Sequence, residues 1–150
     1  MSTTVQTRFT GPARRQRLLS PDECLAWLAG HHEGRLGYLT GRGPRRLAVR
    51  YATSAGQLVF QLPDYNDAVH YVPDEQVSLE VEGWSSTGGF ETVTVVGTAR
   101  RAVDDAAADD HVQLDEAWPS GVVTTVICLP ITEVTGVVTE EDPAAATAAR

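Results

Sequence analysis

Apolar and polar positions alternate most clearly in two neighbouring stretches of the chain, residues 46–52 and 57–62. In the first stretch the side chains at 47, 49 and 51 point to one side of a strand, and those at 46, 48, 50 and 52 point to the other. The second stretch is rich in β-branched and aromatic residues. A turn sequence, Ser54-Ala55-Gly56, stands between them, so the pattern predicts a β-hairpin with Arg46 and Arg50 on one face.

Further elements follow from the same periodicity and from their capping residues. Ser20 starts a capping box with Glu23, which predicts a helix that ends near Ala29. Its predicted buried side is Leu25, Trp27 and Leu28. Asp64 is a candidate N-cap for a short helix through Tyr71. The remaining predicted elements are strands at 34–40, 76–84, 90–103, 122–129 and 131–138, and a helix at 104–117. We therefore expect a mainly β fold with flanking helices, a six-stranded antiparallel split β-barrel built from these seven predicted strands.

The length and the ends of the chain indicate one folded unit. At 150 residues the chain is long enough to bury a core without disulfide or metal support. Residues 1–18 have no periodicity and are expected to form a flexible arm, and the acidic, alanine-rich residues 140–150 a disordered tail. The predicted domain is therefore residues 19–139.

Composition excludes several classes of function. All 12 cationic side chains are arginines, so a lysine Schiff base and a P-loop are impossible. A net charge of −8 disfavours nucleic-acid binding, and no apolar run approaches the roughly 20 residues that cross a membrane. Cys24 and Cys128 are expected to be free core thiols of a cytoplasmic protein. His31 and His32 are expected to be exposed loop residues rather than metal ligands, and no motif names a catalytic side chain.

The order of these elements resembles that of the pyridoxamine 5′-phosphate oxidase-like family, the flavin-binding split β-barrels, from Leu19 to Val138. The segments that carry the resemblance are LSPDECLAWLAG, GRLGYLT, LAVRYATSAGQLVFQL, VSLEVEGW, ETVTVVGTARRAV and ITEVTGVV. The resemblance implies a six-stranded split barrel that forms a homodimer, with FMN or F420 in a cleft at the interface. It also implies an oxidoreductase that acts on a small molecule.

The resemblance also implies the residues of a cofactor site. The flavin ring would lie on the first hairpin strand, the ribityl-phosphate on the second, and the phosphate in the turn that follows. Two tryptophans would close the cleft from one subunit or the other. In this order the residues are Leu47, Ala48, Val49 and Arg50, then Phe60 and Gln61, then Tyr65 and Asn66, and finally Trp84 and Trp118.

The phosphate turn departs from the family pattern, because Asp64 and Asp67 stand where cations are common. Two interpretations follow. The carboxylates could repel a phosphate, which favours a cofactor-free dimer acting as a small-molecule-binding or regulatory module. Alternatively, Asp64 could cap a helix. Arg50 likewise has two interpretations, as a ligand contact or as the ion-pair partner of Glu80 or Glu82.

Overall fold

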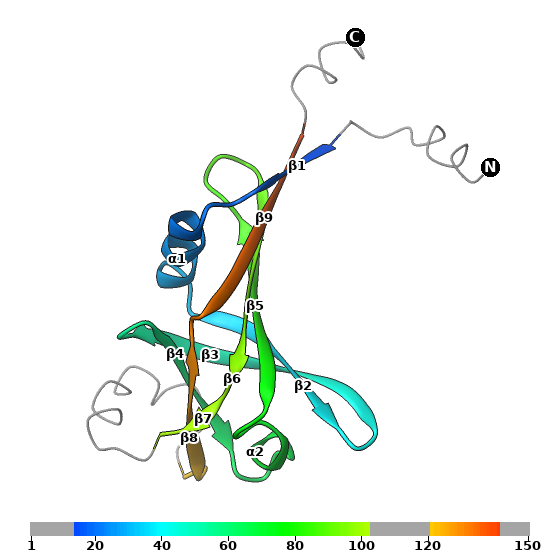
Figure 1. Ribbon diagram of the computed structural model, residues 1–150, viewed down its shortest axis with the longest axis vertical. Helices are drawn as coiled ribbons and strands as arrows, with labels where there is room; N and C mark the ends of the chain where they lie inside the picture. The colour runs from blue at the N-terminus through cyan, green and yellow to red at the C-terminus, as the bar shows by residue number, and fades with distance from the viewer. Residues whose placement is uncertain (1–13, 103–120, 142–150) are drawn as a thin grey trace, which may run out of the picture.

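The computed structural model describes residues 14–102 and 121–141 (Figure 1). The strands are β1 (Arg14–Leu18), β2 (Glu33–Thr40), β3 (Gly43–Ser54), β4 (Gln57–Pro63), β5 (Gln76–Trp84), β6 (Phe90–Thr98), β7 (Arg100–Arg101), β8 (Thr124–Pro130) and β9 (Glu133–Glu141). The helices are α1 (Pro21–Ala29) and α2 (Ala68–Tyr71). The strands pair antiparallel in the order β1-β9-β6-β5-β2-β3-β4-β8-β7. The expected mainly β, antiparallel fold is confirmed, with nine strands in the described residues rather than six.

Strand β3 belongs to two sheets. Its first part pairs with β2 over residues 43–50, and its last part pairs with β4 over residues 51–54. We call the sheet β1-β9-β6-β5-β2-β3 the large sheet and the sheet β3-β4-β8-β7 the small sheet. Figure 1 shows β3 passing from the side of β2 to the side of β4. The predicted hairpin is confirmed: Ala55 and Gly56 both have positive φ, 50° and 77°, as a tight two-residue hairpin turn requires.

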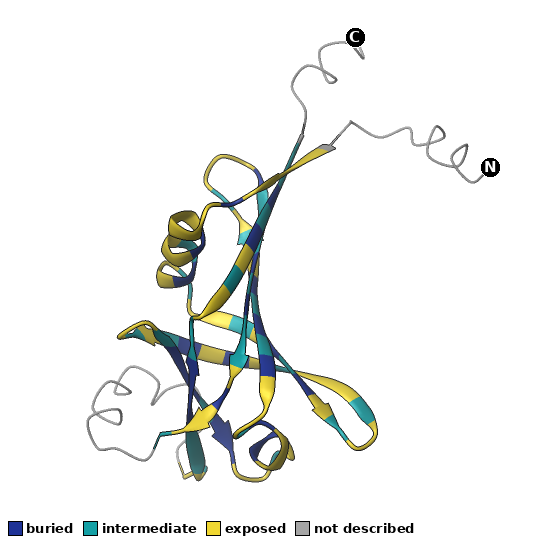
Figure 2. Ribbon diagram, viewed as in Figure 1, coloured by how far each residue is buried: buried dark blue, intermediate teal, exposed yellow. Residues whose placement is uncertain are grey.

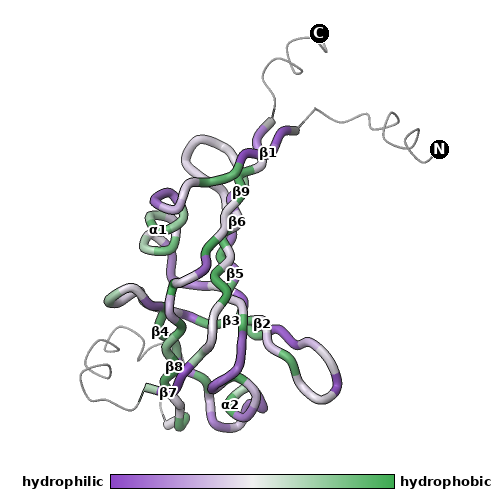
Figure 3. The backbone as a smooth tube through the Cα atoms, viewed as in Figure 1, coloured by the Kyte–Doolittle hydropathy of each residue, from purple (hydrophilic) through white to green (hydrophobic). Residues whose placement is uncertain are grey.

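The alternation predicted for β3 separates a core face from an outer face. Val49 and Tyr51 are buried, whereas Arg46, Ala48 and Arg50 are exposed (Figure 2). The core collects side chains from both sheets and both helices, and the apolar stretches along β4 and β8 are evident in Figure 3. Its fully buried members include Leu28, Leu36, Leu58, Phe60, Leu79, Val95, Ile127 and Leu129. Burial of these side chains is the main stabilising contribution to the fold.

Helix α1 begins at the predicted capping box. Glu23 donates its backbone N–H to Ser20 Oγ at 3.1 Å, and Ser20 donates its own N–H to Glu23 Oε1 at 2.9 Å. The predicted buried side is partly wrong, because the fully covered positions are Cys24 and Leu28 while Leu25 is 43 % exposed. Positions 24 and 28 are four apart and share the face that meets the sheet, whereas position 25 is turned away from it.

Three boundaries differ from the sequence analysis because each depends on a partner far away in the chain. Residues 14–18, at the end of the predicted arm, form β1 against β9, which itself extends to Glu141. The predicted strand 90–103 is interrupted at Ala99, whose N–H donates to Glu75 O, and continues as β7 in the small sheet. The predicted helix at 104–117 lies outside the described residues.

Candidate functional site

Strand β3 leaves one of its edges without a neighbour between residues 44 and 50. Tyr51 N donates to His32 O at 2.8 Å, which fixes the antiparallel ladder with β2. In such a ladder alternate residues bond to the neighbour, so the N–H and C=O groups of Arg46, Ala48 and Arg50 point to the opposite edge. None of the strands in the described residues pairs there. Pro44, which has no N–H, stands on this same edge, where proline is tolerated. We call residues 44–50 the open edge of β3.

The open edge begins where β3 and β4 separate. Their pairing starts at the turn and ends at Tyr51 and Phe60, and β4 continues along β8 through Gln61 to Pro63. The turn 64–67 follows directly. The structure therefore brings together three of the predicted elements, namely the first hairpin strand, the end of the second and the turn after it.

The exposed side chains of the open edge are cationic. Arg46 and Arg50 lie on the same face as Ala48, and neither forms an ion pair with any residue that the structure describes. The alternative that paired Arg50 with Glu80 or Glu82 is not realised, because both carboxylates lie on β5, which β2 separates from β3, and neither forms an ion pair with Arg50. Arg50 therefore stands at the end of the open edge without an ion pair in the described residues, although Glu33 lies opposite it on β2.

The two carboxylates of the turn are both held by hydroxyl groups of the protein. Thr125 Oγ1 donates to Asp64 Oδ1 at 2.8 Å, and Tyr38 OH donates to Asp67 Oδ1 at 3.0 Å. The interpretation of Asp64 as a helix cap is wrong, because α2 begins only at Ala68 and β8 supplies a hydroxyl to that carboxylate. Each carboxylate therefore has a partner other than a ligand, which reduces the repulsion expected in the turn.

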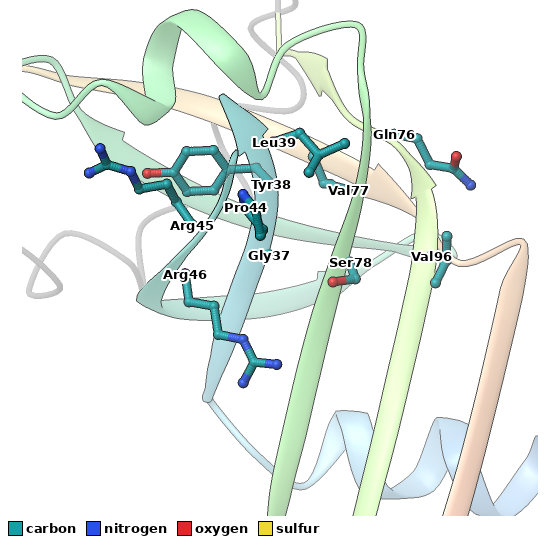
Figure 4. A pocket seen from close by; sticks show the side chains of 10 residues that line it. All are labelled: Gly37, Tyr38, Leu39, Pro44, Arg45, Arg46, Gln76, Val77, Ser78 and Val96. Carbon is teal, nitrogen blue, oxygen red and sulfur yellow. The ribbon is translucent and has the colours of Figure 1, made fainter. Parts of the chain in front are cut away.

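A cation that sequence reasoning missed stands close to this turn. Arg45 lies opposite Tyr38 in the ladder, and Figure 4 shows its guanidinium on the same side as the Tyr38 hydroxyl. Desolvation and the bond to Asp67 raise the pKa of Tyr38, while the charge of Arg45 acts in the opposite direction. Only the register between β2 and β3 could have placed Arg45 beside Tyr38.

The other predicted site residues are distributed between the core, the turn and the far end of β5. Val49 and Phe60 are buried in the core within strands paired to β2 and β8, and Leu47 packs partly against the core. Tyr65 is 70 % exposed, and Asn66 accepts from Ala68 N with Oδ1, which leaves its NH₂ group to donate outward. Trp84 stands at the opposite end of β5 from the turn, edge-on to Phe90. Trp118 lies outside the described residues.

Metal and thiol chemistry find little support in the described part of the chain. It contains no group of three or more His, Cys, Asp or Glu side chains arranged to hold a metal ion. His31 is half-buried rather than exposed, since it bonds to Trp27 O at 2.7 Å and its ring lies against Trp27. Cys24 and Cys128 are free and buried as expected, and burial raises the pKa of each thiol. Within the described ranges, no helix has the length and apolarity to span a bilayer.

Several solved structures share this fold. The FAD binding protein from Mycobacterium smegmatis is 20% identical with a TM-score of 0.67, and the match covers 80% of this chain and 97% of that one. An FAD-binding protein from Mesorhizobium loti is 22% identical with a TM-score of 0.67, covering 86% and 100%. The FAD and heme binding protein from M. smegmatis is 15% identical with a TM-score of 0.67, covering 89% and 79%.

These similarities establish the fold, the split barrel that the resemblance implied. No curated protein matches the sequence. The sequence model of one family, described as pyridoxamine 5′-phosphate oxidase, matches residues 20–138, which contain β3, its open edge and the turn 64–67. With this match, the chain belongs to the pyridoxamine 5′-phosphate oxidase family.

Proposed function

We propose that the protein binds a flavin along the open edge of β3 and uses it in the oxidation or reduction of a small molecule. The observation that carries the proposal is the row of backbone groups at Arg46 and Ala48, which no strand in the described residues pairs with. A flavin ring needs a flat surface and backbone donors and acceptors at its polar edge. An open strand with a small residue at its centre offers both.

The charged groups of the site fit an anionic flavin. Arg50 and Arg45 carry guanidinium groups without an ion pair in the described residues, and the Asn66 amide and Tyr65 hydroxyl add neutral donors. Hydrogen bonds to a charged phosphate are about twice as strong as neutral ones. Because Asp64 and Asp67 are held by Thr125 and Tyr38, this donor set outweighs them, which favours the flavin protein over the cofactor-free module.

The roles of the chain are binding and orientation. A bound flavin supplies the electron-exchanging chemistry, so the protein needs no catalytic nucleophile. The β3 backbone would fix the polar edge of the ring, and Arg50 would place a positive charge beside it. Positive charge near a flavin favours its reduced, anionic form.

We also propose that the working form is a homodimer. No described element covers the outer face of the large sheet. Glu80 and Glu82 of β5 and Glu133 at the start of β9 lie on this face, whereas the rest of β6 and β9 carries mostly threonine and valine there. The residues are Thr92, Thr94, Val96, Thr135 and Val137. Trp84, 72 % exposed, lies at one end of this face. A second copy packed here would bring its Trp84 toward a flavin site that a single chain leaves half built.

The candidate flavins are FMN and F420, as the family resemblance implies. FAD is a third candidate, because two of the similar structures are FAD-binding proteins. The test is the absorbance spectrum of freshly purified protein, followed by titration of colourless protein with each of the three. We expect one of them to bind with a Kd below about 100 μM, roughly −5.5 kcal/mol. If none of the three flavins binds, the cofactor-free small-molecule-binding or regulatory module becomes the better-supported function.

A further inference from the structure

A cleft of about 360 Å³ opens beside the first residues of the open edge. It forms where β2 and β5 separate, because their pairing covers only residues 35–37 of β2 and the following residues diverge. Its lining comes from β2, β3, β5 and β6, on the outer face of the large sheet (Figure 4). We call it the Arg46 cleft. Its volume falls at the small end of the range for ligand sites, about 300–1,000 Å³.

A glycine forms the floor of the cleft. Gly37 is opposite Arg46 on one side and Ser78 on the other, so the three residues form one row across the sheet. A Cβ added to Gly37 would lie 2.7 Å from Ser78 Oγ, closer than real contacts allow. The missing side chain therefore keeps the floor open between a guanidinium and a hydroxyl. Figure 4 shows Arg46 extending toward β5, whereas Arg45 points away beside Tyr38.

The lining combines two arginines, Arg45 and Arg46, with apolar walls, and only Arg46 extends over the cleft floor (Figure 4). Arg46 has no ion pair in the described residues, and no carboxylate lines the cleft. Ser78, the Gln76 amide and the Tyr38 hydroxyl are the further polar groups, and the walls are Leu39, Pro44 and Val96. Because Arg45 points away from the floor, a ligand there meets the planar fork of Arg46 alone, which matches one carboxylate, whereas a dianionic phosphate would need both cations.

We propose that the Arg46 cleft binds the carboxylate of a small, mainly apolar organic acid, and that such acids are the substrates of the flavin site. Only the claim that such acids are substrates rests on the proposed flavin function. Arg46 belongs both to the cleft and to the open edge, so an acid held there lies next to the strand that would carry the flavin. The apolar body of the acid would contact Leu39, Pro44 and Val96.

The test uses benzoate and its neutral counterpart benzamide as probes, titrated calorimetrically into the full chain without added flavin. We expect benzoate to bind about tenfold or more tightly than benzamide, the scale of a hydrogen bond to a charged group. Arg46→Gln should remove this preference. Arg35→Gln is the matched control, because Arg35 is exposed on the same face with the same charge but does not line the cleft.

Two further measurements separate the possible failures. Val96→Phe fills the cleft without a change of charge and should abolish benzoate binding if the cleft is the site. Equal affinity for the two probes, or an Arg46→Gln variant that binds benzoate as the wild type does, would overturn the proposal. Flavin titrations of the same variants test the two proposals separately. Benzoate binding without flavin binding would support the cleft as an acid site and overturn the proposed redox function. Flavin binding without benzoate binding would overturn only the proposal for the cleft.

Discussion

The two parts of β3 share one alternation of inward and outward side chains but differ in how many neighbouring strands they pair with. From Tyr51 to Ser54 the strand pairs with β4, and Tyr51 is buried with its hydroxyl donating to Leu28 O at 2.7 Å. From residue 44 to 50 it pairs on one edge only and exposes Arg46, Ala48 and Arg50. The first part is held on all sides by the protein, and the second keeps backbone groups and charges available for a ligand. A single strand thus anchors the fold at one end and presents the candidate site at the other.

The largest expected effect lies in the paired part. Phe60 is fully buried opposite Tyr51, so Phe60→Ala leaves a cavity and should lower the free energy of unfolding by about 3–5 kcal/mol. Urea denaturation followed by circular dichroism measures this loss. Leu39→Ala, at a position 68 % exposed, is the control and should change stability by no more than about 0.5 kcal/mol. A small loss in Phe60→Ala would show that the paired part is not the anchor.

The open edge should give the opposite result. Arg50→Gln is expected to weaken flavin binding by about 1.5–3 kcal/mol, the scale of a hydrogen bond to a charged group. Its melting temperature should stay close to that of the wild type, because Arg50 forms no ion pair in the described residues. Fluorescence titration and thermal denaturation of the same sample give both values. A lower melting temperature with unchanged flavin affinity would show that Arg50 stabilises the fold and does not contact the cofactor.

The smallest effect concerns α1, which touches the paired part through Leu28 O and Tyr51 OH. The hydrogen bond that the Ser20 N–H donates to the Glu23 carboxylate, and next the hydrogen bond from the Arg17 side chain, lower the pKa of Glu23 below its ordinary 4.5. A lowered folded-state pKa stabilises the protein above the ordinary pKa, and this contribution is lost as pH falls through the folded value. Glu23→Gln should therefore melt below the wild type at pH 7 and approach it well below pH 4.5. A difference that persists in acid would contradict this account of the cap.

Local signals were enough for the hairpin and the first helix. The alternation from residue 46 to 52 gave the faces of β3, and the pair Ser20 and Glu23 gave the start of α1. Both depend on residues within a few positions of one another, where steric preference and capping chemistry decide the outcome. The family resemblance, drawn from the order of such elements, is confirmed by the match over residues 20–138.

Contacts between segments that are distant in the sequence could not be predicted from local patterns. Asp64 meets Thr125 across 61 positions. The chain leaves the large sheet at Ala99, whose backbone bonds to Asp74 and Glu75, and the next two residues pair with β8. No local pattern encodes such a choice, since many hydroxyls could satisfy one carboxylate. For the candidate site, sequence placed Ala48 and Arg50 on an accessible face but could not show that their edge lacks a neighbour.

The most direct test of the open edge is a flavin titration of Ala48→Pro beside Ala48→Ser. The Ala48 N–H points away from β2, so a proline there removes a donor that the sheet does not use, and edge strands tolerate such a proline. We predict that both variants fold, that Ala48→Ser binds the flavin as the wild type does, and that Ala48→Pro loses about 1 kcal/mol or more of binding free energy. Flavin binding by Ala48→Pro with wild-type affinity would contradict the claim that the open edge of β3 holds the cofactor.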